Sequence, residues 1–244
     1  MQIKTDYLVT SPSRWEALAP YSMNPTEITF HNTYNDASAL NEVKNVYNNS
    51  TGTSFHTAVD DKEVQQVIPF NRNAWHAGDG ASGRGNRHSI GVEICYSKSG
   101  GDRYRLAEKN AIDHISDLMI KFNIPIEKVK THQERSGKYC PHRMLDEGRV
   151  KWFKDQLVSA VNFKKNGGGN VVVKPNTNIL QSGGFGYIMA TEVMDAMVQS
   201  GVTGKLVVLN DGTFYVETDR MQNETLWKLD NIFLARGWWF QYLG

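Results

Sequence analysis

A run of glycines two thirds of the way along the chain is the feature that most constrains its fold. The segment Phe163-Lys164-Lys165-Asn166-Gly167-Gly168-Gly169-Asn170 follows a stretch with helical spacing. Three consecutive glycines offer no side chains to a core, so such a segment is typical of a flexible connection. We therefore predict two domains, residues 1–163 and 171–244, joined by a glycine-rich linker over residues 164–170.

The charge balance excludes partners that bind through general electrostatics. The 244 residues carry 27 Lys and Arg against 26 Asp and Glu, a net charge of +1, and 40% of them are hydrophobic. Such a chain can bury sizeable cores but has no overall attraction for nucleic acid or anionic lipid. We expect neither partner, and the pattern fixes no oligomeric state. The first residues also lack an export signal, and no stretch approaches the ~20 apolar residues of a membrane span.

Hydrophobic periodicity predicts mixed strands and helices in the first domain. Strands are expected at 27–33, 55–59, 64–68 and 89–96, and helices at 38–49 and 106–122. The second and third strands should form a hairpin, and the strand at 89–96 should be central because it is apolar on both faces. This order predicts an α/β domain with a mixed central β-sheet flanked by helices.

The tail has the pattern of a small α+β domain. Strands are expected at 178–182, 205–209, 213–218 and 238–242, with helices at 187–199 and 224–235. Asn210-Asp211-Gly212 between two alternating runs is a strong hairpin signal. The resulting β-α-β-β-α-β order matches the split β-α-β arrangement of ferredoxin-like domains.

Three residues have the chemistry of a zinc site. His132 and Cys140 lie eight positions apart around a Ser-Gly turn, and a loop of that length can return both side chains to one point. Imidazole and thiolate suit Zn²⁺, and His31 in its strand offers a third ligand on the face opposite Phe30. Three protein ligands with one open position are typical of a catalytic zinc ion. A disulfide between Cys95 and Cys140 is the alternative, although a cytosolic product would keep both reduced.

Two further residues are candidates for catalysis. Glu93 lies in an apolar strand, where a carboxylate must be paired, neutralised or functional. It is either a general base or the partner of Arg87 or Lys130 in an ion pair. Lys138 is either a donor to a developing oxyanion or a solvated loop lysine.

The aromatic segment Trp238-Trp239-Phe240 near the C-terminus allows two interpretations. Aromatic side chains are suited to stacking on sugar faces. Alternatively, Trp238 and Phe240 face the core while Trp239 covers a helix.

Several segments together give the first domain a family resemblance. The chain resembles the type 2 N-acetylmuramoyl-L-alanine amidases, which share their fold with peptidoglycan recognition proteins, and especially the endolysins of phages that infect Gram-positive bacteria. The segments that carry the resemblance are Ile28-Thr29-Phe30-His31-Asn32-Thr33, Ser54-Phe55-His56-Thr57-Ala58-Val59-Asp60, Asn73-Ala74-Trp75-His76-Ala77-Gly78, Asn86-Arg87-His88-Ser89-Ile90-Gly91-Val92-Glu93, and Thr131-His132 with Lys138-Tyr139-Cys140-Pro141-His142.

The resemblance implies roles for individual residues. It places the zinc ligands on His31, His132 and Cys140, the catalytic carboxylate on Glu93 and an auxiliary lysine on Lys138. Some members have a catalytic tyrosine where this chain has Phe55, which shifts the proton-transfer role to Glu93. His76 matches a position that lines the substrate groove, whereas His56 matches a family position for which a structural role is equally expected.

Asn32, Trp75 and the glycine-rich loop at 78–86 are expected to border the same cleft. A glycine-rich loop next to a metal site commonly shapes access, and we predict substrate contacts for Asn32 and Trp75.

The expected function is hydrolysis of the amide between N-acetylmuramic acid and L-alanine in peptidoglycan by zinc-activated water, with lysis of the host cell. The tail resembles the C-terminal domain of some phage amidases, so we expect it to bind a cell-wall polymer. The enzyme would be made in the host cytoplasm without a signal peptide and act on the wall after release. Two alternatives share the fold or the metal: a non-catalytic peptidoglycan receptor, which typically lacks the cysteine ligand, and a zinc peptidase that cuts within the stem peptide.

Overall fold

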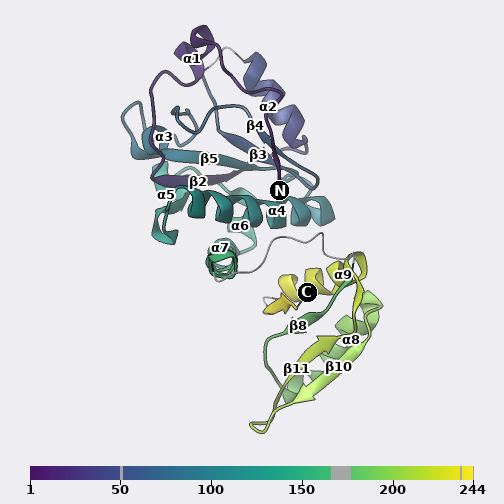
Figure 1. Ribbon diagram of the computed structural model, residues 1–244. Coiled ribbons are helices and arrows are strands. Elements are labelled where there is room, and N and C mark those ends of the chain that lie inside the picture. Colours follow the sequence, from purple (N-terminus) through teal and green to yellow (C-terminus); the bar gives the residue numbers. More distant parts are fainter. Residues whose placement is uncertain (50–51, 166–176, 237, 244) are drawn as a thin grey trace. The chain divides into compact units, whose positions relative to one another are not determined.

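The chain divides into two compact units, Met1–Gly168 and Gly169–Gly244. A computed structural model describes residues 1–49, 52–165, 177–236 and 238–243, and each unit is described by itself (Figure 1). Residues 166–170 of the predicted linker lie outside the described residues. Lys164 and Lys165 are the last two residues of the final helix of unit 1. Nζ of Lys164 also pairs with Asp113 and Asp117 of that unit at 2.7 Å each.

Unit 1 has the alternating strands and helices that the sequence predicts. Its elements are β1 (Ile3–Lys4), α1 (Pro12–Leu18), β2 (Glu27–Asn32), α2 (Ala39–Asn48), β3 (Thr57–Val59), β4 (Val64–Gln66), α3 (Arg84–His88), β5 (Ser89–Ile94), α4 (Gly101–Lys121), the 3₁₀ turn η1 (Ile126–Lys128), β6 (Val129–Thr131), α5 (His132–Ser136), α6 (His142–Asp146) and α7 (Val150–Lys165).

The six strands of unit 1 form one mixed sheet in the order β1-β4-β3-β5-β2-β6. Between the described strands of this sheet, β3 and β4 pair antiparallel and the other neighbours run parallel. β5 lies in the interior, as its apolar sequence predicts. The predicted α/β class with a mixed central sheet is confirmed.

Helices cover both faces of this sheet. Phe30 of β2 packs on Phe153 of α7, with ring centroids 4.9 Å apart, and Thr57 of β3 bonds to His114 of α4. α2 lies on the opposite face (Figure 1). Because side chains alternate along a strand, His31 faces away from α7.

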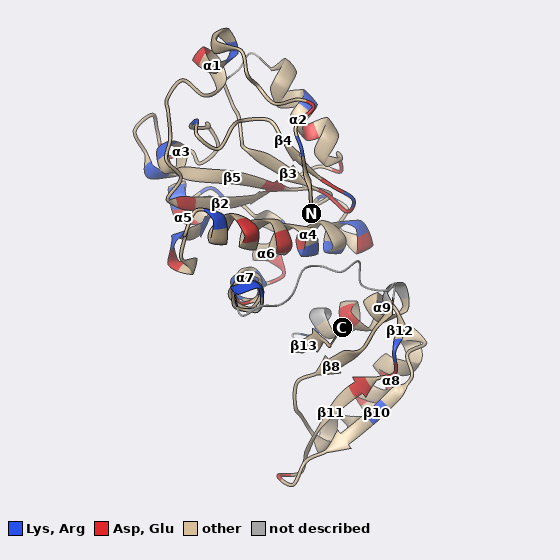
Figure 2. Ribbon diagram, in the orientation of Figure 1, with Lys and Arg blue, Asp and Glu red and all other residues tan. Residues whose placement is uncertain are grey.

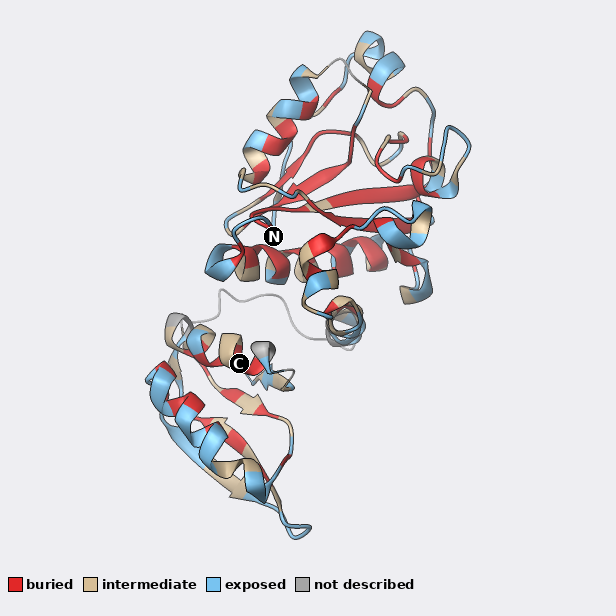
Figure 3. Ribbon diagram, turned by 180° about the vertical axis from the view of Figure 1, so that it is seen from behind, coloured by how far each residue is buried: buried red, intermediate tan, exposed pale blue. Residues whose placement is uncertain are grey.

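Apart from the edge strand β1, the strands of unit 1 are almost entirely buried, and few of their residues are charged. Figure 2 shows Lys, Arg, Asp and Glu gathered mainly on helices and loops, and Figure 3 shows the strands coloured as buried. A charged residue within a buried strand is therefore unusual in this unit.

The long helix α4 begins at Gly101, five residues before the predicted start. Tyr104 is fully buried and extends the apolar face toward the N-terminus of the helix, and Gly100 precedes the helix with a φ of 71°.

Unit 2 has the predicted β-α-β-β-α-β order with short additions. Its elements are β7 (Thr177–Asn178), β8 (Leu180–Ser182), β9 (Phe185–Gly186), the 3₁₀ turn η2 (Tyr187–Met189), α8 (Ala190–Ser200), β10 (Gly204–Val208), β11 (Thr213–Thr218), β12 (Met221–Gln222), α9 (Asn223–Ala235) and β13 (Phe240–Tyr242). The four main strands run antiparallel in the order β10-β11-β8-β13. This is the order that the split β-α-β interpretation predicts.

The β10–β11 turn forms as its sequence predicts. Gly212 has a φ of 80°, a conformation that side chains disfavour, and Asp211 accepts bonds from the backbone and hydroxyl of Thr213. The turn sets the register that places Leu206 opposite Val216.

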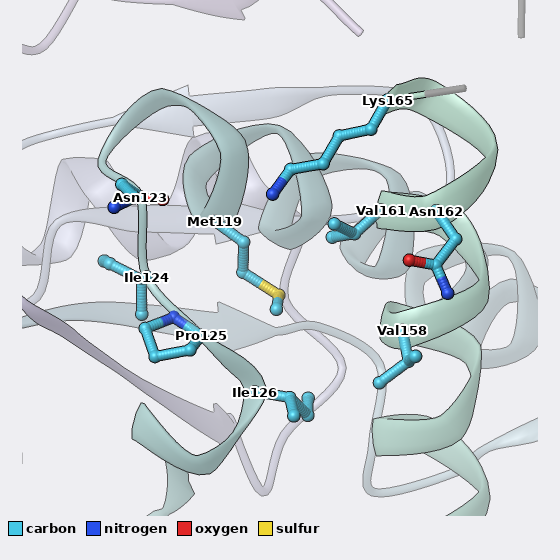
Figure 4. A pocket seen from close by; sticks show the side chains of 9 residues that line it. All are labelled: Met119, Asn123, Ile124, Pro125, Ile126, Val158, Val161, Asn162 and Lys165. Carbon is cyan, nitrogen blue, oxygen red and sulfur yellow. The ribbon is translucent and has the colours of Figure 1, made fainter. Parts of the chain in front are cut away.

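A pocket lies between the loop after α4 and the helix α7 of unit 1 (Figure 4). Its lining is mostly apolar and consists of Met119, Asn123, Ile124, Pro125, Ile126, Val158, Val161, Asn162 and Lys165. None of the predicted site residues lines it.

Among the described residues, no helix has the length and apolar character needed to cross a membrane.

Candidate metal centre and catalytic groups

His31, His132 and Cys140 come together in unit 1 although they are far apart in sequence. Their ligand atoms all lie within 4.8 Å of one another, and all three residues are buried. Nδ1 of His31 is 3.0 Å from Nδ1 of His132 and 3.8 Å from Sγ of Cys140.

Strand β6 and helix α5 position His132 next to His31 and Cys140. It is the first residue of α5, which follows directly on β6 at the edge of the sheet next to β2. Thr131 and Glu134 form a capping box around the helix start. Arg135 then ties the helix to β2 by bonding to Thr29 and to the buried carboxylate of Glu27.

Cys140 is returned to the same point by the loop after α5. Its backbone oxygen accepts a hydrogen bond from the backbone N–H of Gln133 at 2.9 Å, which closes the loop. Sγ of Cys140 lies 3.9 Å from the backbone oxygen of Asn32. Both Cys140 and Cys95 are free thiols, so the alternative of a disulfide between them is wrong.

The donor set fits a zinc ion. Bond lengths of ~2.0–2.1 Å for nitrogen and ~2.3 Å for sulfur imply tetrahedral separations of about 3.3 Å between nitrogens and about 3.6 Å between nitrogen and sulfur. The separations of 3.0 and 3.8 Å are close to these values. Burial lowers the pKa of His132 to about 4 and that of His31 well below its usual value, which keeps both imidazoles neutral as ligation requires.

Burial raises the pKa of the Cys140 thiol to about 12. A bound cation would therefore have to displace the thiol proton, as metal ions do at cysteine sites.

Glu93 lies beside this group on the same face of the sheet. It is in register with His31 across the parallel β2–β5 pair, so both side chains project to one side. Burial raises its pKa to about 8, with a further rise from the nearby Glu42 and an opposing effect of Lys138. Among the described residues, Oε2 of Glu93 is buried without a hydrogen-bond partner.

The alternative ion pairs for Glu93 are not formed. Lys130 pairs with Glu134 at 3.8 Å, and the guanidinium of Arg87 lies over the ring of Tyr21 at 3.8 Å. The carboxylate therefore keeps a free oxygen in a low-dielectric site, which is the environment of many catalytic acids and bases.

Lys138 is exposed on the loop that carries Cys140. Its positive charge lowers the pKa of His31, His132, Glu93 and Cys140, so it acts electrostatically on the whole group.

His76 lies behind His31 and is buried. Its Nδ1 is 3.1 Å from Nε2 of His31, and its Nε2 is 3.3 Å from the backbone oxygen of Ser89. A Cβ at Gly91 would approach the His76 ring to 2.8 Å, so this glycine leaves room for the imidazole. The predicted substrate contact of His76 stays a prediction, and the contact with His31 is one that the sequence analysis missed.

Asn32 and Trp75 also make contacts within the protein. The Asn32 side chain bonds to the Tyr104 hydroxyl and accepts from the backbone N–H of Arg143 at 3.2 Å. Trp75 is half-buried and its ring lies edge-on to that of Tyr21 at 6.1 Å. Their predicted substrate contacts remain predictions.

His56 has both ring nitrogens bound to backbone. Nδ1 accepts from the Gly91 N–H, and Nε2 lies 2.9 Å from the Arg72 oxygen. Burial lowers its pKa to about 4. These contacts give it the structural role that was one of its two expected roles, whereas Phe55 is buried in the core.

Comparisons with known proteins identify the class of this molecule. A family model described as N-acetylmuramoyl-L-alanine amidase matches residues 21–143, and one described as PlyG cell wall binding domain matches residues 199–242. The amidase CwlA of a Bacillus species is 55% identical over 240 residues, which cover 93% of this chain and 95% of CwlA.

Solved structures agree with these sequence matches. PlyL is 57% identical with a TM-score of 0.62 over 64% of this chain and 97% of PlyL. The solution structure of the PlyG catalytic domain is 55% identical with a TM-score of 0.63, over 66% of this chain and 96% of that domain.

The fold and these matches define a peptidoglycan-cleaving enzyme with an attached wall-binding domain. The chain belongs to the type 2 N-acetylmuramoyl-L-alanine amidase family. Peptidoglycan is its substrate, and its C-terminal part is a cell-wall-binding domain. Its relatives are amidases, which sets aside the receptor and stem-peptide peptidase alternatives.

Proposed function

We propose that this chain is a zinc-dependent endolysin that cleaves the bond between N-acetylmuramic acid and L-alanine and thereby lyses the host cell. Residues 1–165 would form the catalytic domain, since Lys164 and Lys165 continue α7, with residues 166–170 as the linker and 171–244 as the domain that binds a cell-wall polymer. The protein would act on the cell wall, as its endolysin relatives do.

The carrying observation is the convergence of His31, His132 and Cys140 beside a buried carboxylate. The ligand atoms of two imidazoles and one thiol lie within 4.8 Å of one another, and Glu93 projects from the neighbouring strand on the same face of the sheet. Three protein ligands that leave a position open are typical of catalytic zinc sites. A buried carboxylate with a free oxygen costs folding free energy, and it is expected at a catalytic site more than at a purely structural one.

His31, His132 and Cys140 would hold the zinc ion. When bound, zinc supplies a Lewis acid that polarises the scissile carbonyl and makes water acidic enough to react near neutral pH. Its positive charge would also lower the pKa of Glu93 from about 8, so that the carboxylate is ionised at neutral pH.

Glu93 then moves the proton. Its free oxygen accepts a proton from the attacking water and returns one to the nitrogen of the leaving L-alanine. The Lys138 ammonium stabilises the oxyanion that forms on the carbonyl oxygen. His76, Trp75 and Asn32 are proposed to contact substrate at the edge of this group.

Analysis of the reaction products tests which bond is cleaved and whether cleavage requires the metal. Purified peptidoglycan is treated with the protein before and after zinc removal by a chelator, and the products are identified by mass spectrometry. We expect stem peptides with a free L-alanine amine and N-acetylmuramic acid without its peptide. Activity should vanish with the metal and return on addition of Zn²⁺.

Variants separate the ligands from the base. His132→Ala should abolish both zinc binding and activity, whereas Glu93→Gln should lower kcat by about 100-fold or more and retain zinc. The exposed His88→Ala serves as the matched control and should change neither. Full activity of the metal-free protein, or of His132→Ala, would reject zinc dependence.

A further inference from the structure

Within the described residues of unit 2, 177–236 and 238–243, the sheet has one face that neither α8 nor α9 covers. α8 and α9 pack against each other and against buried residues such as Val216 and Leu180. Figure 1 shows α8 behind this sheet, and Figure 3 shows it in front. Residues that alternate with the buried ones therefore form an open face.

A row of hydrogen-bonded side chains crosses this open face from edge to edge. Nε2 of Gln241 donates to Oε1 of Gln181 at 2.8 Å, and Nε2 of Gln181 donates to Oε2 of Glu217 at 3.2 Å. Nζ of Lys205 pairs with Oε1 of Glu217 at 2.8 Å. The four residues come from β13, β8, β11 and β10, so the row spans about 14 Å at ~4.8 Å per strand.

An exposed tryptophan lies beside this row. Trp239 is 50% exposed and precedes Gln241 by two positions, which places it on the open face. The backbone of Gly183 bonds to that of Trp239, and a Cβ at Gly183 would lie 3.4 Å from the indole. The ring therefore rests against a backbone without a side chain and keeps half its surface free.

The neighbouring aromatics have a different role. Trp238 contacts Phe185 with ring centroids 5.0 Å apart, and Phe240 contacts Phe233 at 6.2 Å. Both face the core, as the alternative interpretation expected. That interpretation is wrong for Trp239, which lies on the face opposite the helices.

The chemistry of the open face suits an uncharged, hydroxyl-rich ligand. Lys205 lowers the pKa of Glu217, so the pair stays ionised and its charges cancel. Each glutamine amide uses only one of its two N–H groups in the row, which leaves donors for sugar hydroxyls. The ~4.8 Å spacing between strands is comparable with the length of a sugar ring.

We propose that this face binds a neutral saccharide chain of the cell wall, with Trp239 stacked on one sugar ring and Gln181 and Gln241 bonded to hydroxyls. The inference rests on the wall-binding role of unit 2 and names the face and the ligand class. An anionic polymer would find no unpaired cation in the row.

The test compares variants of the full chain in binding to purified Bacillus subtilis cell walls, by sedimentation on ice. Trp239→Ala should raise the dissociation constant at least about tenfold, because exposed tryptophans dominate such contacts. Trp239→Phe should retain most of the affinity, and Gln181→Ala with Gln241→Ala should weaken binding several-fold. Val198→Ala, which is 78% exposed on α8, is the matched control and should bind as the unchanged protein does.

Salt and a competitor identify the ligand class. Binding to a neutral glycan should change less than about twofold between roughly 50 and 500 mM NaCl and should resist soluble poly(glycerol phosphate). A steep loss with salt, or competition by that polyanion, would overturn the proposal in favour of an anionic polymer. Sedimentation velocity tests whether a second copy of the chain covers this face. A dimer that Trp239→Ala converts to monomers would also overturn the saccharide proposal.

Parallel measurements keep the two proposals distinct. Each variant is assayed on soluble muropeptides, where all should match the unchanged protein, and its melting temperature is recorded. If Trp239→Ala unfolds unit 2, the test rests on the variant with both Gln181→Ala and Gln241→Ala, and unaltered wall binding by that folded variant rejects the face. Unaltered wall binding by a folded Trp239→Ala rejects the face, whereas loss of amide cleavage after intact wall binding rejects only the catalytic proposal.

Discussion

His76 connects His31, one of the proposed metal ligands, to the backbone of Ser89 through a short chain of hydrogen bonds. If Nδ1 of His31 faces the metal, its Nε2–H donates to Nδ1 of His76, and the Nε2–H of His76 donates to the Ser89 carbonyl. Partners of this kind fix the tautomer and the ring orientation of a ligating histidine. Beside the proposed substrate contact, the buried side chain of His76 therefore supports the ring of His31.

His76→Ala should weaken zinc binding by about 10–100-fold, because His31 loses the acceptor that holds its ring. Competition with a chromophoric chelator measures this affinity, and it does not depend on turnover. His88→Ala should leave the affinity unchanged. An unaltered zinc affinity in His76→Ala would show that the hydrogen bond is dispensable.

His114 makes the free energy of unfolding depend on pH. Burial in α4 lowers its pKa from 6.5 to about 3, and its Nε2 lies 3.0 Å from the Thr57 hydroxyl. Because the unfolded chain takes up the proton at a higher pH, the stability that this residue contributes is complete above pH 6.5 and is lost as the pH falls toward 3.

The loss at pH 4 should be on the order of 3 kcal/mol for His114. Urea unfolding of the metal-free protein at pH 7 and pH 4 measures it, and His114→Gln should show a correspondingly smaller difference between the two pH values. His88→Gln should retain the full difference. Equal acid sensitivity of His114→Gln and the unchanged protein would contradict the assignment.

Residue chemistry suggested the group at the proposed metal site, and the family resemblance assigned it, but neither indicated its supports. His31, His132, Cys140 and Glu93 are the residues that these two arguments predict together. The contact between His31 and His76 depends on ring positions 45 residues apart, which no local pattern encodes. The same reason explains the wrong ion-pair alternatives for Glu93.

Helix α5 is short, and its ends determine where His132 points. Oγ1 of Thr131 accepts from the backbone N–H of Glu134 at 3.0 Å, and Oε2 of Glu134 accepts from the backbone N–H of Thr131 at 2.7 Å. The Thr-x-x-Glu pattern was readable in the sequence and was missed.

Thr131→Ala should lower the free energy of unfolding by about 1 kcal/mol, the usual cost of losing an N-terminal cap. It should also reduce zinc affinity, because His132 is the next residue. Thr131→Ser keeps the hydroxyl and should restore both properties. Urea unfolding and chelator competition are the measurements, and a stable, tight-binding Thr131→Ala would contradict the role of the cap.

Long or strongly patterned elements were predictable, and very short ones were not. The β10–β11 hairpin was predicted from Asn210-Asp211-Gly212 to within a residue or two. β1 and β6 have only two and three residues, and they exist because β4 and β2 offer pairing partners elsewhere in the chain. Such strands depend on tertiary pairing more than on their own propensity.

The two units have separate hydrophobic cores. Residues 1–168 alone should therefore fold and cleave soluble muropeptides at the rate of the full chain. Their dissociation constant for intact walls should rise at least about tenfold, because the second point of attachment is lost. Wall sedimentation and muropeptide mass spectrometry measure the two quantities, and unchanged wall binding would contradict the targeting role of unit 2.

The pairing of β2 with β5 has a consequence for how such enzymes diversify. Six register pairs hold His31 level with Glu93, and a slip of one residue would bring Phe30 to the position of His31. A change in this register would separate the two side chains, so substitutions that keep the proposed reaction are expected in the loops and in unit 2.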